Sequence, residues 1–306
     1  MSRAILITGA TGKQGGAVVD ALLNHKSSDV LLAVTRNANS ASARRLAAKS
    51  SSIKIVEGDL DAASTLFASA KAAAGATPLW GVFSVQAMGD KKSDQETRQG
   101  KALIDEAIKA GVQHFVYSSV ERGGDERSWN NPTPVPHFIT KHRIEHHLRD
   151  STADNKSPMG WTILRPVIFM DNLAPGFFSK VFLTMIHDTM GEKPLQWIAT
   201  KDIGFFAAEA FRDPKTWNKK AIGLAGDSLT FSQLSQTFES VTGEPAGTTF
   251  GVLGKALKHG VQEVGIMVSW FKDEGYKANM AEIKRIHPDV MTMRDWLKES
   301  AFVKKQ

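Results

Sequence analysis

Ile7-Thr8-Gly9-Ala10-Thr11-Gly12-Lys13-Gln14-Gly15 is the stretch that decides the fold, because it joins an apolar strand pattern to a helical pattern. Its glycines are spaced GxxGxxG. The first permits a sharp turn, the second lets the backbone approach a diphosphate, and the third lets the helix pack close to the strand. The alternative is a purely structural turn. The stretch predicts a dinucleotide-binding turn with these cofactor contacts: Gly9, Thr11, Gly12, Lys13, Gln14 and Gly15.

Apolar β-branched runs alternate with helical patterns through the first half of the chain. The predicted strands are 4–8, 30–35, 53–57, 79–85, 113–117 and 161–165, and the predicted helices are 13–25, 40–49, 62–74, 93–110 and 137–149. Strands that are apolar throughout and separated by helices indicate a parallel sheet covered on both faces. The sequence therefore predicts an α/β fold with a Rossmann-type, doubly wound parallel sheet, whose ligands bind at the carboxyl ends of the strands.

The alternation weakens after about residue 150. Residues 173–190, 201–213, 230–242 and much of 254–300 have helical patterns, and Ala221–Leu224 reads as a late strand. We therefore expect a cofactor-binding Rossmann domain at 1–155. A smaller, mostly helical region at 156–306 is expected to contact the substrate or a partner and to be interleaved with the last strands of the sheet.

Composition excludes several classes of function. The chain has 306 residues and no cysteine, so disulfides, thiolate metal sites and cysteine nucleophiles are ruled out. The net charge of +6 comes from scattered lysines and arginines, which does not favour direct nucleic-acid binding. No run approaches the roughly 18 apolar residues that cross a bilayer. We expect a cytoplasmic protein with no membrane contact.

The residues after the second and third strands bear on the choice of cofactor. The second strand ends in Thr35-Arg36-Asn37, where NAD-preferring domains carry an acidic residue for the ribose 2′-hydroxyl. The planar fork of Arg36 suits a 2′-phosphate instead, and Lys13 offers a second cation, so NADP(H) is predicted. Asp59 and Leu60 are expected beside the adenine. Asp59 has an alternative role as a helix cap.

The fourth strand ends in Ser84-Val85-Gln86, close to the expected diphosphate and ribose. Gln86 is therefore a further candidate contact with the cofactor. Four histidines lie on one predicted helix, and His142 and His146 have the spacing of two metal ligands. No nearby carboxylate completes such a site, so we expect no metal.

Motifs along most of the chain resemble the NmrA-like group of atypical short-chain dehydrogenases/reductases. They are the glycine turn, Val34-Thr35-Arg36-Asn37, Glu57-Gly58-Asp59, Gln99-Gly100-Lys101, Val116-Tyr117-Ser118-Ser119, His137-Phe138 with Lys141, Leu164-Arg165-Pro166, Met170-Asp171-Asn172 and Asp202-Ile203-Gly204. The resemblance implies a Rossmann domain with a smaller C-terminal domain and a preference for NADP(H). It implies either a reductase of quinones or small aromatic compounds, or a redox sensor without turnover that regulates partners such as transcription factors.

Typical short-chain dehydrogenases use a Tyr-x-x-x-Lys pair, in which the lysine holds the nicotinamide ribose and the tyrosine exchanges a proton. In this chain Lys141 is present, but His137 occupies the position of the tyrosine. A neutral histidine can pass a proton, so His137 is a catalytic candidate, with lining of the cleft as the alternative. In isoflavone-reductase-like enzymes an equivalent lysine is itself the proton-handling group. This role is the alternative to ribose contact for Lys141.

The remaining candidates follow the fifth and sixth strands. Val120 falls where some alignments place the catalytic serine, so Ser118, or alternatively Ser119, is expected to contact the cofactor instead. The resemblance places Pro166 and Phe169 beside the nicotinamide, with core packing as the alternative for Phe169. The prediction is an NADPH-dependent reductase of a quinone or a conjugated, aromatic-type carbonyl compound. A non-catalytic NADP(H) sensor with a protein partner is the alternative, and either a monomer or a homodimer is compatible with the sequence.

Overall fold

The computed structural model describes residues 2–25, 28–87, 94–153, 156–249 and 262–303. Packing divides the chain into two units. Unit 1 comprises 1–119, 140–165 and 200–222, and unit 2 comprises 120–139, 166–199 and 223–306. The sequence predicted a single boundary near residue 155. In the structure, residues 120–139 belong to unit 2, whereas residues 156–165 and 200–222 belong to unit 1, because the chain adds strands to the sheet of unit 1 there.

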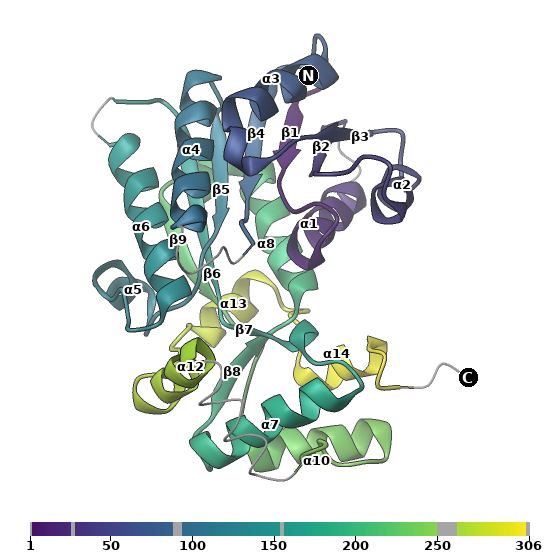
Figure 1. The fold of residues 1–306 in the computed structure, drawn as a ribbon, viewed down its shortest axis with the longest axis vertical. Helices are drawn as coiled ribbons and strands as arrows, with labels where there is room; N and C mark the ends of the chain where they lie inside the picture. The colour runs from purple at the N-terminus through teal and green to yellow at the C-terminus, as the bar shows by residue number, and fades with distance from the viewer. Residues whose placement is uncertain (1, 26–27, 88–93, 154–155, 250–261, 304–306) are drawn as a thin grey trace. The chain divides into compact units, whose positions relative to one another are not determined.

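Unit 1 is built on a seven-stranded sheet with the order β3-β2-β1-β4-β5-β6-β9 (Figure 1). Its strands are β1 (Ala4–Ile7), β2 (Val30–Thr35), β3 (Ile53–Glu57), β4 (Leu79–Ser84), β5 (His114–Ser118), β6 (Gly160–Pro166) and β9 (Lys220–Leu224). The strands from β3 to β6 pair in parallel. This is the strand order of the doubly wound fold, so the predicted fold class is confirmed.

Helices cover the large sheet. They are α1 (Lys13–Asn24), α2 (Ala41–Ala47), α3 (Ala63–Ala74), α4 (Gln95–Lys109), α6 (Pro136–Ser151), α8 (Thr200–Arg212) and α9 (Pro214–Trp217), with a 3₁₀ turn, η1 (Leu60–Ala62). Two glycines of the family motifs permit close helix packing. A Cβ on Gly204 would lie 2.4 Å from the Ala17 carbonyl oxygen of α1, and one on Gly100 would lie 2.4 Å from Ile144 of α6.

A fully buried ion pair fixes α6 to the sheet. Glu145 of α6 accepts from Arg165 of β6 through two hydrogen bonds, of 3.1 and 2.8 Å, and neither side chain is exposed. The Ser119 hydroxyl also donates to Glu145. A buried charge needs such partners, so this cluster holds the helix in one position.

Unit 2 contains a second sheet with the order β10-β8-β7. Its elements are α5 (Asp125–Asn130), β7 (Ile168–Phe169), η2 (Met170–Asn172), α7 (Phe177–Met190), β8 (Leu195–Ile198), β10 (Asp227–Leu229), α10 (Phe231–Thr242), α12 (Gln262–Asp273), α13 (Met280–Ile286) and α14 (Met293–Glu299). Its core includes Phe138, Trp197, Phe238 and Trp270. The expected helical character is confirmed, but this small sheet was missing from the sequence prediction. Residues 254–261, predicted as helical, lie outside the described residues.

Among the described residues, no helix is both long and apolar enough to cross a bilayer.

Candidate functional site

The glycine turn has the backbone geometry that the sequence predicts. Gly9 has a positive φ of 60°, which an L side chain adopts only with strain, and the Gly12 amide donates to the Gly9 carbonyl oxygen at 2.9 Å. A Cβ on Gly15 would lie only 2.3 Å from that same oxygen. The turn therefore folds tightly back on itself between β1 and α1.

The amino terminus of α1 is suited to an anion. Gly12 is its cap residue, no side chain caps the first turn, and no acidic residue lies there. The first N–H groups of a helix have no partner within the helix and carry a partial positive charge. Phosphate groups commonly bind at this kind of helix start.

Side chains tie the glycine turn to two neighbouring strand ends. The Ser118 hydroxyl at the end of β5 donates to the Gln14 side-chain oxygen at 2.5 Å. At the end of β4, the Val85 amide donates to Thr8 Oγ1 at 2.8 Å, and the Thr8 hydroxyl donates to the Val85 carbonyl at 2.9 Å. The structure thus brings Gln14 and Ser118 together at the carboxyl edge of the sheet.

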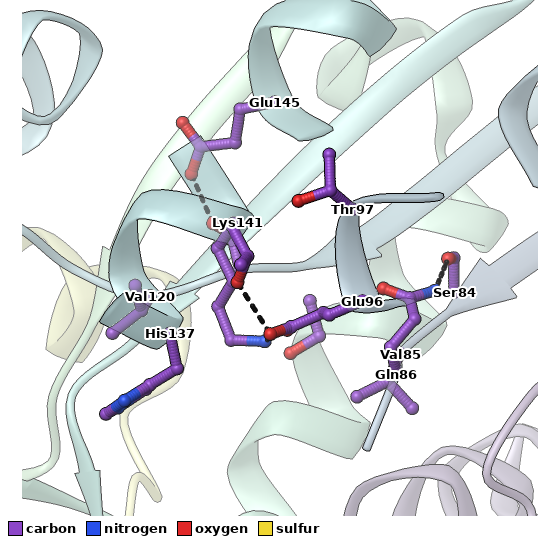
Figure 2. Close-up of polar contacts among 12 residues, drawn as sticks. Ser84, Val85, Gln86, Glu96, Thr97, Val120, His137, Lys141 and Glu145 are labelled. Carbon is purple, nitrogen blue, oxygen red and sulfur yellow. Dashed lines mark hydrogen bonds and ion pairs between the residues drawn. The ribbon is translucent and has the colours of Figure 1, made fainter. Parts of the chain in front are cut away.

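Gln86, just after β4, keeps one polar atom unsatisfied. Its Nε2 donates to Ser84 Oγ (Figure 2), and the two atoms are 2.8 Å apart. Its Oε1 is buried and has no hydrogen-bond partner within the part of the chain that the structure describes. Buried polar atoms without a partner are rare, and a ligand is one usual explanation. The predicted cofactor contact of Gln86 is compatible with this position.

The predicted adenosine contacts lie after β2 and β3. Arg36 is exposed, and the turn that follows it is held by Glu57, whose Oε2 accepts from the Ala38 amide at 2.8 Å. Asp59 is exposed and caps η1 by accepting from the Asp61 amide at 2.9 Å. The structure thus contains the cap that was the alternative role for Asp59. Its contact with adenine, and that of half-buried Leu60, remain predictions.

Lys141 on α6 is paired with a buried carboxylate from α4. Its ammonium donates to Glu96, and the Thr140 hydroxyl donates to the other Glu96 oxygen at 2.6 Å. Figure 2 shows the two side chains pointing toward one another. The side chain of Glu96 is 4% exposed and that of Lys141 is 14% exposed. Sequence reasoning missed Glu96. The sequence feature that points to Glu96 is a carboxylate four residues before Gly100, on the buried face of the same helix.

His137 lies one turn before Lys141 on the same helix, and this first turn of α6 belongs to unit 2. Its Nδ1 is 2.6 Å from Oε1 of Glu263, near the start of α12. The two side chains are 16% and 15% exposed. Sequence reasoning missed Glu263, which is 126 positions away along the chain.

The remaining candidates are distributed over both units. Pro166 is buried at the end of β6, and Phe169 is half-buried in β7. Their contacts with the nicotinamide remain predictions. Val120 is buried in the apolar core of unit 2 and offers no hydroxyl group. Ser119 is engaged by Glu145, so its hydroxyl has a structural role.

The sheet order and the glycine turn at α1 define a Rossmann-type protein. The profile of the NmrA-like family matches residues 1–297, and the chain belongs to this family. One relative is the NmrA-like family domain-containing oxidoreductase hkm9 of Aspergillus hancockii. It is 29% identical over 262 residues, which are 80% of this chain and 74% of the relative.

Solved structures share the fold. The NADPH-dependent quinone oxidoreductase QOR2 of Escherichia coli, complexed with NADPH, aligns with a TM-score of 0.71 and 20% identity over 98% of this chain and 99% of its own. NmrA, a negative transcriptional regulator in complex with NADP, aligns with a TM-score of 0.70 and 18% identity over 97% and 94%. At these identities the likeness shows the fold alone.

Proposed function

We propose that this protein is an NADPH-dependent reductase of quinones or of conjugated, aromatic-type carbonyl compounds. The residues of unit 1 fit a dinucleotide in three respects: a turn with no room for side chains at its glycines, an uncapped helix start, and the buried Gln86 acceptor. The hkm9 oxidoreductase, a relative of 29% identity, supports an oxidoreductase, and the quinone oxidoreductase is an example of this fold in a quinone-reducing enzyme. NADPH, when bound, supplies the hydride.

The observation that carries the proposal is the buried pairing of Lys141 with Glu96. Because a carboxylate only accepts hydrogen bonds, Lys141 must donate to it, and the ammonium is held in one place. A held ammonium can donate to the hydroxyls of a ribose. We therefore assign Lys141 to holding the nicotinamide ribose, and the proton-handling role to another group.

We assign the proton-handling role to His137. With a conjugated carbonyl compound, the substrate would gain the cofactor's hydride at carbon and the proton of the His137 imidazolium at oxygen. The C=O π bond and the imidazolium N–H bond break, and a C–H and an O–H bond form. With a quinone, the hydride and the proton end on the two oxygens and give the hydroquinone. In both cases His137 is left neutral and regains a proton from solvent. General acids of this kind contribute about 10²- to 10⁴-fold to the rate.

The proposal is tested by steady-state oxidation of NADPH with a panel of quinones. Wild type is expected to exceed the background without enzyme. We expect Lys141→Ala to lower kcat/KM by about 100-fold, a loss of about 2.7 kcal/mol of transition-state stabilisation. His137→Ala is expected to lower kcat by at least about 100-fold. Lys109→Ala is the matched control, because Lys109 pairs with Glu106 on the exposed surface of α4. Wild-type turnover at background across the panel would remove the reductase assignment.

A redox sensor is the second candidate, because His137 replaces the usual tyrosine and Val120 lacks a hydroxyl. The fold is also that of NmrA, a transcriptional regulator. A sensor must bind the oxidised and reduced cofactors with different affinities. Calorimetric titration with NADP⁺ and NADPH distinguishes the candidates: absence of turnover together with a clear preference for one redox form supports the sensor.

The preference for NADP(H) rests on Arg36 and is tested separately. A charge-assisted hydrogen bond contributes about 1.5–3 kcal/mol, so Arg36→Ala is expected to weaken NADPH binding by about 10- to 100-fold. NADH lacks the 2′-phosphate, and its dissociation constant is expected to change little. Arg212→Ala, an exposed arginine at the end of α8, serves as the control. An equal loss for both cofactors would show that Arg36 does not read the 2′-phosphate.

A further inference from the structure

We propose that Glu263 is a positioning residue, which orients His137 and fixes its tautomer so that Nε2 is the atom that exchanges the proton with the substrate. This inference rests on the proposed function. Its basis is the 2.6 Å contact between His137 Nδ1 and Glu263 Oε1 inside unit 2. Both side chains are more than four-fifths buried, which limits screening of the pair by water.

The tautomer follows from the chemistry of the two groups. An ionised carboxylate has no hydrogen to donate, so the bond requires a proton on Nδ1. His137 is then either the neutral Nδ1–H tautomer or the imidazolium, and the two states differ only at Nε2. Glu263 thus makes Nε2 the site of proton exchange. The imidazolium is the state that donates the proton in the proposed reaction.

Packing around the pair holds the imidazole in place. The Phe138 ring meets the His137 ring edge-on, with centroids 4.7 Å apart, and also contacts Trp270 of α12 edge-on at 5.3 Å. Glu263 and Trp270 are seven residues apart, which places them on one face of α12. The same face of α12 therefore holds two consecutive residues of α6, His137 by its nitrogen and Phe138 by its ring.

A contact that only holds α6 against α12 would have the same geometry. The test therefore needs a readout that a purely structural contact would not change. The ¹⁵N NMR signals of the His137 ring report its tautomer, and His137→Gln identifies those signals. In wild type we expect the Nδ1–H form. In Glu263→Ala the neutral ring is expected to shift toward the Nε2–H form, which is the more stable one in free histidine.

Kinetics supply the second readout, with saturating NADPH and the best quinone of the panel. Loss of a carboxylate that orients a metal-bound histidine typically costs about 10- to 100-fold, and we expect the same range for a histidine that exchanges a proton. We expect this fall in kcat for Glu263→Ala and Glu263→Leu, which both remove the acceptor, with the NADPH dissociation constant unchanged, and partial rescue in Glu263→Asp. Glu274→Ala is the matched control. It removes a carboxylate just beyond the end of α12 that pairs with Arg127, and it is expected to change neither readout.

The outcomes separate the two proposals. An unchanged tautomer together with unchanged kcat in Glu263→Ala overturns the positioning role while leaving the reductase in place. Absence of turnover in wild type overturns the reductase, whereas the NMR result still shows whether Glu263 sets the ring. If Glu263→Ala does not fold, Glu263→Leu replaces it. This variant keeps side-chain volume and removes the acceptor, so an unchanged tautomer together with unchanged kcat in Glu263→Leu overturns the positioning role.

Discussion

Gly15→Ala is expected to weaken NADPH binding by at least about 100-fold, which is about 2.7 kcal/mol. The added Cβ would lie 2.3 Å from the Gly9 carbonyl oxygen and 2.7 Å from the Ala10 amide nitrogen. Both are backbone atoms and cannot rotate away, so the whole turn has to shift. A shift of the turn moves the amides that are proposed to bind the diphosphate, and displacements near 1 Å are costly in such sites.

The neighbouring glycine offers a matched control. A Cβ on Gly16 would meet its nearest atom, the Ala10 carbonyl oxygen, at an ordinary 3.5 Å. Gly16→Ala is therefore expected to keep the NADPH dissociation constant and to stabilise α1 by about 0.5–1 kcal/mol. Fluorescence titration with NADPH measures the affinities, and circular dichroism checks that the variants fold.

Gly12→Ala provides a second variant if Gly15→Ala does not fold. Its Cβ would lie 3.2 Å from the Gly9 oxygen, so the turn has to adjust by only a few tenths of an ångström. We expect an intermediate loss of affinity that leaves the fold intact. Wild-type affinity in both Gly12→Ala and Gly15→Ala would mean that the turn does not bind the cofactor.

The large sheet could be predicted from the sequence because its signals are local. Each of its first strands is an apolar run, and each is separated from the next by a segment with helical spacing. A parallel sheet buried on both faces leaves this pattern in any chain that forms it. The glycine turn then fixes where the first strand ends and the first helix begins.

The small sheet of unit 2 could not be predicted in the same way. β7 has two residues and β10 has three, and alternation over so few positions carries no information. Their pairing with β8 joins Ile168 to Trp197 and Trp197 to Asp227. These contacts depend on tertiary packing, which a local pattern does not encode.

The residues of the candidate site show the same difference between local sequence signals and tertiary packing. The glycine turn, Arg36 and Gln86 follow predicted strands, so their place at the carboxyl edge followed from the sheet alone. Glu96 and Glu263 act through partners 45 and 126 positions away, and they come from helices whose packing the sequence did not predict. The sequence therefore predicted the charged groups on α6 without the carboxylates that hold them.

Three residues that are four positions apart lie along one face of α6. Each contacts a side chain that carries, or can carry, the opposite charge. His137 contacts Glu263, Lys141 contacts Glu96, and Glu145 contacts Arg165. Only the last pair is fully buried. It therefore anchors the helix that carries Lys141, and its loss is expected to affect stability more than loss of either other pair.

Glu145→Ala is expected to lower the free energy of unfolding by about 3–5 kcal/mol, since it leaves the Arg165 guanidinium buried and without its carboxylate. The Ser119 hydroxyl loses its acceptor in the same variant. Equilibrium unfolding in urea measures the change. Lys49→Ala is the control, because the Lys49–Asp20 pair is about half exposed and such pairs contribute about 0–1 kcal/mol.

The double variant Glu145→Leu with Arg165→Met separates the charge effect from a packing effect. It removes both charges and keeps apolar volume at both positions, so it is expected to recover most of the stability lost in Glu145→Ala. A loss in the double variant as large as in the single one would assign the effect to packing. A loss below about 1 kcal/mol in the free energy of unfolding of Glu145→Ala would show that the buried Arg165 needs no carboxylate partner. Other contacts would then fix the part of α6 that carries Lys141.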